Sequence, residues 1–111
     1  MKNPECVIIL ITCKDEDEAR KIAGGLLTRR QAACVNIIPR LVSLFHWQGK
    51  INQADEVLLL IKTRAVLFEA VRKTARELHS YQTPEIIAVP LVDGDNDYID
   101  WINLETQHDS A

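Results

Sequence analysis

Several features that would narrow the class of this protein are missing from its sequence. Apolar runs such as residues 57–61 fall far short of the roughly 20 apolar residues that a membrane-spanning helix needs. The first residues lack the basic and apolar segments of a signal peptide, so we expect a cytoplasmic protein. Neither a glycine-rich phosphate loop nor a nucleophile motif such as G-x-S-x-G occurs, so we do not expect an enzyme.

Cysteine is scarce as well. The chain has three, Cys6, Cys13 and Cys34, and no two of them are close in sequence. An odd, scattered set does not make a disulfide framework and fits a reducing compartment. Because no C-x-x-C pair is present, neither a zinc ribbon nor a thioredoxin-type redox site is indicated. We expect Cys6 and Cys34 to be core residues.

The composition is that of one globular domain over residues 1–111, with 47% hydrophobic and 26% charged residues and a net charge of −3. No lysine or arginine follows Arg76, whereas eight acidic residues do: Glu77, Glu85, Asp93, Asp95, Asp97, Asp100, Glu105 and Asp109. This acidic end could attract cations or a basic surface of another subunit, although a solvated surface is the simpler interpretation. Dispersed basic residues and the lack of an RNA-binding aromatic motif argue against a nucleic-acid partner, and no membrane partner is indicated.

The order of the expected elements predicts a ferredoxin-like fold. Hydrophobic periodicity indicates strands at residues 6–13, 33–47, 56–63 and 86–92, and helices at residues 15–30, 64–79 and 98–104. This β-α-β-β-α-β order with a short C-terminal helix belongs to the α+β class, with two helices on one face of one sheet. The other sheet face is left bare, and Phe45 and Trp47 lie near the end of the long second strand. Because a bare apolar face is an association surface, we predict an oligomer built through the sheets.

Local signals refine two of these elements. Asp15 and Glu18 resemble a capping box at the start of the first helix, and the Arg29–Arg30 pair falls where its last turn is expected. Gly24–Gly25 conflicts with a helix interior, and close packing or looseness is the only account of it. In the second strand, Pro39 marks a bulge or an edge position, and residues 48–50 form the turn of a hairpin.

The stretch of residues 79–85 joins the second predicted helix to the fourth predicted strand, and such joints commonly carry ligand-binding groups. His79 is a candidate metal ligand, although a histidine cation stabilised by the helix dipole is the alternative. Tyr81 and Glu85, together with Lys62, are polar candidates for a cleft between subunits. Structural hydrogen bonds and ion pairs are the alternative for these three.

Five segments resemble the divalent-cation tolerance family, CutA, in the same order along the chain. They are residues 31–39, residues 47–51, the two ends of the third predicted strand (residues 56–57 and 61–63), residues 79–86 and residues 97–102. The resemblance implies a ferredoxin-like subunit in a tight homotrimer, similar in plan to the PII signalling proteins. It also implies a role in the tolerance of, or response to, divalent metal ions, chiefly copper.

The resemblance further implies a copper site made by a thiol near the end of the first strand and by histidines before the tyrosine of the joint. This chain has Ile11 at the thiol position and Leu78 at the first histidine position, and only His79 matches. Cys13 lies two residues beyond Ile11 on the same strand face and is a substitute thiol. Thiolate and imidazole together suit copper or zinc, but an adjacent subunit or solvent would have to complete the site.

Other residue patterns have simpler explanations beside the functional one. Cys13 is the sort of free cysteine that usually serves as a small buried hydrophobe. The acids of residues 93–97 begin like an EF-hand loop, but Tyr98 and Leu104 stand where Gly and Glu are required, so a turn and helix N-cap involving Asp97 or Asp100 is favoured. Trp47 and Trp101 could frame a ligand, or fill the core or a subunit interface.

Three functional hypotheses remain open at this point. The first is a non-enzymatic, trimeric, metal-responsive or metal-binding protein of the CutA type. The second is a PII-like sensor that binds an anion or small metabolite between subunits, using Lys62, Arg64 and Tyr81 near strand ends, a hypothesis that depends on fold analogy. The third is a rigid scaffold or anchor for another protein.

Overall fold

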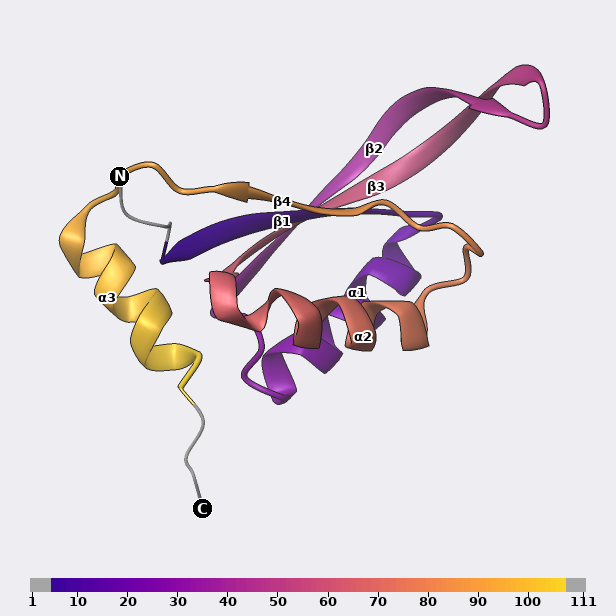
Figure 1. The fold of residues 1–111 in the computed structure, drawn as a ribbon. Helices are drawn as coiled ribbons and strands as arrows, with labels where there is room; N and C mark the ends of the chain where they lie inside the picture. Colours follow the sequence, from indigo (N-terminus) through magenta and orange to yellow (C-terminus); the bar gives the residue numbers. More distant parts are fainter. Residues whose placement is uncertain (1–4, 108–111) are drawn as a thin grey trace.

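The computed structural model describes residues 5–107, and within them the elements follow the predicted order. They are β1 (Cys6–Cys13), α1 (Glu16–Thr28), β2 (Cys34–Trp47), β3 (Lys50–Arg64), the 3-10 turn η1 (Ala65–Leu67), α2 (Phe68–Leu78), β4 (Ile86–Pro90) and α3 (Asn96–Glu105). The strands form one antiparallel sheet in the order β2-β3-β1-β4, and α1 and α2 lie together on one side of it (Figure 1). This arrangement confirms the ferredoxin-like α+β prediction. None of the helices in the described range is long and apolar enough to cross a membrane.

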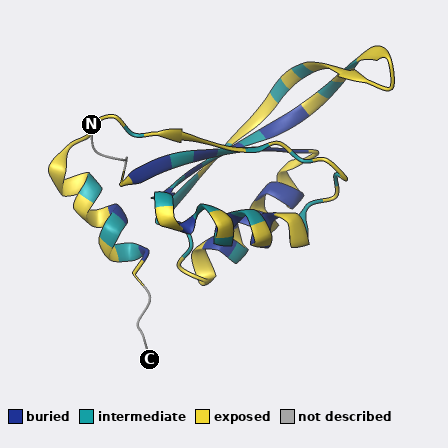
Figure 2. Cartoon of the chain, in the orientation of Figure 1, coloured by how far each residue is buried: buried dark blue, intermediate teal, exposed yellow. Residues whose placement is uncertain are grey.

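The core lies between the sheet and the two helices, and β1 runs through its centre (Figure 2). Side chains alternate along a strand, so every second residue of β1 points toward the helices. Ile9, Ile11 and Cys13 lie on this face and are fully buried. They pack against the helix residues Ile22, Leu26 and Val71 and the β3 residues Leu59 and Ile61. The central position of β1 therefore places its last residue, Cys13, where the sheet meets the start of α1.

The two ends of α1 are fixed by different capping interactions. Asp15 is the N-cap, and its carboxylate accepts from the Glu18 N–H at 2.8 Å, as the capping-box pattern predicts. At the other end, Arg30 adopts φ 54°, and the Gln31 N–H donates to the Leu26 carbonyl in a Schellman-type closure. The helix thus ends at Thr28, and the expectation that Arg29 and Arg30 lie in its last turn was wrong.

The paired glycines of α1 have different environments. A Cβ on Gly25 would lie 3.0 Å from Leu78 Cδ1 and 3.6 Å from Thr74 Cγ2, whereas a Cβ on Gly24 would meet nothing within 4 Å. Gly25 therefore allows α1 to approach α2 closely. The structure shows no comparable constraint at Gly24.

Strands β2 and β3 form a long hairpin that extends beyond the two helices (Figure 1). Gln48 and Gly49 both have positive φ, which matches a two-residue turn of the hairpin type. The register shifts between Ile38 and Leu41, so Pro39 lies in a bulge of an edge strand as predicted. β3 begins at Lys50 and not at residue 56, because its polar first half is held by pairing with β2 and not by burial in the core.

The remaining boundaries differ slightly from prediction. The chain after β3 passes through η1 before α2 begins, and β4 ends at Pro90. The N-cap of α3 is Asp95, so Asp97 lies in the first turn and neither Asp97 nor Asp100 caps the helix. Asp109, the last acid of the acidic end, lies outside the described residues.

The second face of the sheet is only partly covered in the single chain, where α3 packs against one end of β1 and β3. Ile8, Leu10, Leu58 and Leu60 on this face are only partly buried, and Ile87, paired with Leu10, is 49% exposed. Cys34 pairs with Lys62 on the same face and is partly exposed, so the expectation that it is a core residue was wrong, whereas Cys6 is buried. The incompletely covered apolar face on which the oligomer prediction depends is therefore present.

Matched substitutions at the two glycines test the packing of α1 on α2. We expect Gly24→Ala to raise the free energy of unfolding by about 1 kcal/mol, because alanine favours the helix and meets no neighbour. Gly25→Ala should gain clearly less or lose stability, because its methyl group must displace Leu78. Chemical denaturation at equal protein concentration measures both, and equal gains would contradict the assigned role of Gly25.

Candidate functional site

In the part of the chain that the structure describes, one group of three potential metal-ligating side chains is found: Cys13, Glu18 and His79. Their ligand atoms all lie within 4.8 Å of one another. Cys13 ends β1, Glu18 lies in the first turn of α1, and His79 follows α2 directly. The predicted pair Cys13 and His79 is thus brought together. Glu18 was missed as a possible ligand, because its position in the sequence explains it fully as a capping residue.

The ring of His79 is fully buried, and both of its nitrogens are engaged. Nε2 lies 2.7 Å from the Thr12 carbonyl oxygen, which can only accept, so Nε2 carries the proton. The Tyr81 backbone N–H donates to Nδ1 at 3.1 Å, so Nδ1 provides a lone pair. These contacts assign the neutral Nε2–H tautomer and disagree with the alternative of a histidine cation at a helix terminus.

Glu18 is a buried carboxylate that joins two loops. Its Oε1 accepts from the Lys14 N–H at 3.2 Å, and its Oε2 accepts from the Ser80 N–H at 2.8 Å. Burial by itself raises the pKa of Glu18, but hydrogen bonds from Ser80 and Lys14 hold that pKa below its ordinary value of 4.5. Glu18 therefore remains ionised, with its oxygen Oε1 3.7 Å from His79 Nδ1.

The third member of the group, Cys13, is held as a neutral thiol. Burial, together with the negative charges of Glu18, Glu56 and Asp15, raises the pKa of the Cys13 thiol to about 12. The neighbouring Tyr81 hydroxyl donates to Glu56 Oε2 at 2.8 Å. Burial, followed by this hydrogen bond, raises the pKa of Tyr81 as well, so the phenol remains a donor.

The three donors suit copper or zinc in type and spacing, because sulfur, imidazole nitrogen and carboxylate oxygen are the groups that bind these ions. The hydrogen bonds that these groups make in the structure differ from those of a ligand set. Cys13 would have to lose its proton, and His79 Nδ1 would have to release the Tyr81 N–H. Ile11 is buried in the core and Leu78 packs at its edge, so neither family position supplies a donor.

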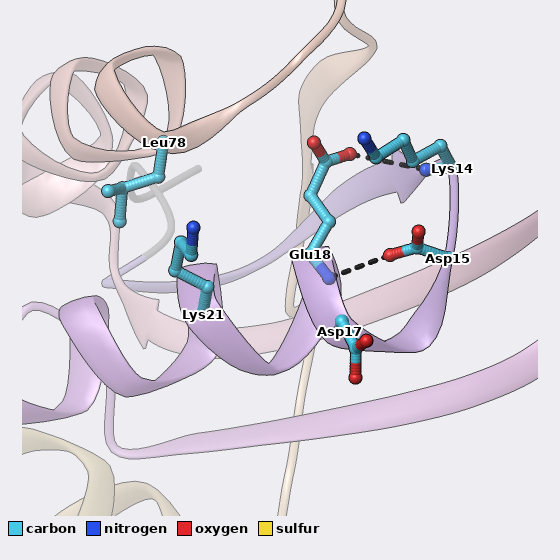
Figure 3. Close-up of a pocket in the computed structure, with 6 residues that line it drawn as sticks. All are labelled: Lys14, Asp15, Asp17, Glu18, Lys21 and Leu78. Atoms are coloured by element: carbon cyan, nitrogen blue, oxygen red, sulfur yellow. Dashed lines mark hydrogen bonds between the residues drawn. The ribbon is translucent and has the colours of Figure 1, made fainter.

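The surface beside Glu18 is strongly charged. A depression of about 300 Å³ opens at the start of α1, lined by Lys14, Asp15, Asp17, Glu18, Lys21 and Leu78. Figure 3 shows the Glu18 side chain pointing toward Lys14 and the Asp15 carboxylate turned back to the helix backbone. Solvent thus reaches the edge of the group on its Glu18 side.

The polar residues of the sensor hypothesis do not converge. Lys62 donates to Asn36, and Arg64 donates to Thr106 Oγ1 and to the Thr106 carbonyl, both at 2.9 Å. Tyr81 instead contacts Glu56, six residues before Lys62 on β3, which separates the two by about 20 Å along the strand. Within one chain, Lys62 and Tyr81 therefore lie too far apart to bind the same small ligand.

The remaining candidates lie at the periphery. Trp47, at the end of the hairpin, is 48% exposed, and Trp101 on α3 is 39% exposed, with Tyr98 beside it at 5.5 Å between ring centroids. Neither tryptophan fills the core of the chain. Glu85 is exposed just before β4, and His46 is exposed on the hairpin.

The acid dependence of stability tests the state of Glu18. A carboxylate whose pKa is lowered by folding contributes stability above pH 4.5, and that contribution is lost as the pH falls through the lowered pKa. We expect Glu18→Gln to reduce the free energy of unfolding by about 2 kcal/mol at pH 7 and to flatten the loss below pH 4.5. Glu16→Gln, an exposed control in the same helical turn, should do neither, and identical acid profiles for the two variants would contradict the assignment.

Comparison with known proteins finds similarity in both sequence and structure over most of the chain. The model of the family described as CutA1 divalent ion tolerance protein matches residues 7–105. The divalent-cation tolerance protein CutA of Thermus thermophilus is 42% identical over 99 residues, covering 89% of this chain and 96% of that protein. The solved structure of CutA from Xylella fastidiosa is 42% identical, covers 93% of this chain and 99% of its own, and superposes with a TM-score of 0.90.

A structure described as the periplasmic divalent cation tolerance protein CutA of Archaeoglobus fulgidus is 40% identical, covers 92% of this chain and 99% of its own, and has the same TM-score of 0.90. The likeness therefore extends over nearly the whole length of each chain, in sequence and in fold. The family is non-enzymatic, as the missing nucleophile motifs led us to expect. The chain belongs to the CutA divalent-cation tolerance family.

Proposed function

We propose that this protein acts in the cellular response to divalent metal ions, copper foremost, by binding the ion at Cys13, Glu18 and His79. The observation that carries the proposal is the meeting of three donor atoms of different type within 4.8 Å, from three separate segments of the fold. The family to which the chain belongs supports the cation class.

The choice of ion follows from the donors. Thiolate and imidazole select copper or zinc over magnesium or calcium, which prefer oxygen ligands alone. Three protein donors leave one position of a tetrahedral site for solvent or for a group of another chain. Glu18, already ionised by its backbone donors, lowers the cost of placing positive charge in this buried position.

The same proposal includes a cytoplasmic homotrimer built through the open sheet face. Ile8, Leu10, Leu58 and Leu60 present a partly buried apolar surface that a second sheet can cover. The exposed Phe45 and Trp47 on the projecting hairpin provide further apolar area, which suits the interface interpretation of Trp47.

Native mass spectrometry with one equivalent of Cu²⁺ or Zn²⁺ per chain tests the metal site. We expect discrete uptake of one ion per chain in the unchanged protein, and at least a tenfold loss of affinity in Cys13→Ser and in His79→Ala, because removing a ligand leaves too few donors. Cys34→Ser and His46→Ala change the same residue types outside the group and should bind like the unchanged protein.

Retained affinity in both site variants, with thermal unfolding showing that they fold, would refute this site. Loss of affinity in the His46 control would assign the binding to the hairpin surface. A trimer that takes up neither ion would keep the family assignment and favour the sensor or scaffold hypothesis instead.

A charge on the open sheet face tests the assembly. Ile87→Lys places an ammonium group on the edge strand β4 of this face, beside Leu10, and we expect it to convert the trimer to monomers, because an unpaired charge in an apolar interface is costly. Val66→Lys makes the same kind of change at a 77% exposed position on η1 and should remain trimeric. Sedimentation velocity distinguishes the two, and a trimeric Ile87→Lys variant would exclude the β4 side of this face from the interface.

A further inference from the structure

The loop of residues 80–85, called here the joint loop, is anchored by the same atoms that the proposed metal site needs. The Ser80 N–H donates to Glu18 Oε2 at 2.8 Å. The Tyr81 N–H donates to His79 Nδ1 at 3.1 Å. The Tyr81 bond uses the single lone pair of His79 Nδ1 that a cation would require, and the Ser80 bond uses one of the several lone pairs of the Glu18 carboxylate. The start of the loop is therefore fastened to two of the three donors.

Two further bonds hold the loop without using those donors. The Tyr81 hydroxyl donates to Glu56 Oε2 at 2.8 Å, and Arg76 donates to the Gln82 carbonyl at 3.3 Å. The Tyr81 ring also lies against the His79 ring, with 4.8 Å between their centroids. Glu56 pairs with Leu41, the first residue after the bulge of β2, so Tyr81 ties the loop to the base of the long hairpin.

With the loop in this position the donors are shielded from solvent. The side chain of His79 is 0% exposed, that of Glu18 is 6% exposed, and Cys13 is fully buried. Only the Glu18 side borders the charged depression at the start of α1 (Figure 3). His79 can offer only Nδ1 to an ion, because Nε2 carries the proton donated to Thr12 and Nδ1 is the nitrogen near Glu18.

We propose that closure of the joint loop and cation binding exclude one another, because both need the single lone pair of His79 Nδ1. Occupancy of the site then releases the Tyr81 amide, and the resulting movement of the loop frees the adjoining Ser80 amide from Glu18 and the Tyr81 hydroxyl from Glu56. This inference depends on the proposed metal site and describes how that site is regulated. The position of the loop and the Tyr81–Glu56 hydrogen bond then change with the occupancy of the site.

The competition sets the measured affinity. An ion that binds only the open loop has an apparent dissociation constant equal to the intrinsic one divided by the open fraction. Any change that weakens loop closure without touching a donor therefore tightens binding. Tyr81→Phe is such a change, since it removes one hydrogen bond to a charged group and keeps the ring against His79.

Hydrogen exchange followed by NMR, with Zn²⁺ as a diamagnetic probe, tests the exclusion directly. We expect the Ser80 and Tyr81 amides to exchange at least tenfold faster at saturating Zn²⁺, while the amides of Ile22 and Leu26 inside α1 keep their rates. Unchanged or slower exchange of Ser80 and Tyr81 at full occupancy would overturn the inference and leave the metal site standing.

Zinc titration of two phenylalanine variants provides the second measurement. Tyr81→Phe should bind Zn²⁺ about tenfold more tightly, the effect of losing one closing hydrogen bond. Tyr98→Phe, the same change on α3, should bind like the unchanged protein. Equal affinities of the folded Tyr81→Phe and Tyr98→Phe proteins would contradict the competition, whereas no Zn²⁺ bound to any variant or to the unchanged protein would refute the proposed function itself.

Discussion

The imidazole of His79 joins two parts of the chain that are 67 residues apart, and the candidate site depends on that contact. Nε2–H holds the Thr12 carbonyl at the end of β1, while Nδ1 accepts the Tyr81 amide at the start of the joint loop. Glu18 adds a second link between the same regions through Lys14 and Ser80. Because His79 and Glu18 are buried and their polar atoms paired, the arrangement avoids the cost of unsatisfied polar groups in the core.

The rest of the fold positions this contact. β1 is an inner strand of the sheet, so Thr12 and Cys13 at its C-terminal end are held rigidly. Close approach of α1 to α2, permitted at Gly25, brings the N-terminal turn of one helix to the C-terminal end of the other. The projecting end of the hairpin and the second face of the sheet leave apolar residues exposed or only partly buried within one chain, and such surfaces favour association.

The structure explains the two positions at which this chain departs from the family's proposed copper ligands. Ile11 is part of the core and Leu78 packs beside Gly25, so both positions serve packing here. The thiol and carboxylate nearest to His79 are instead those of Cys13 and Glu18. The raised pKa of the Cys13 thiol, caused by burial and by Glu18, Glu56 and Asp15, shows that this group favours the protonated state without an ion.

Local patterns in the sequence determined the order of elements, the N-cap at Asp15 and the bulge at Pro39, because periodicity and capping act over a few neighbouring residues. The polar joint identified His79 as a candidate, and the family resemblance added Cys13 as a substitute thiol. Only the tertiary structure decided that Glu18 joins these two, that Lys62 and Tyr81 lie apart, and that Cys34 and both tryptophans are outside the core. The C-terminal end of α1 and the start of β3 were predicted wrongly for the same reason. The left-handed conformation of Arg30 and the cross-strand pairing of polar residues depend on partners that the fold supplies.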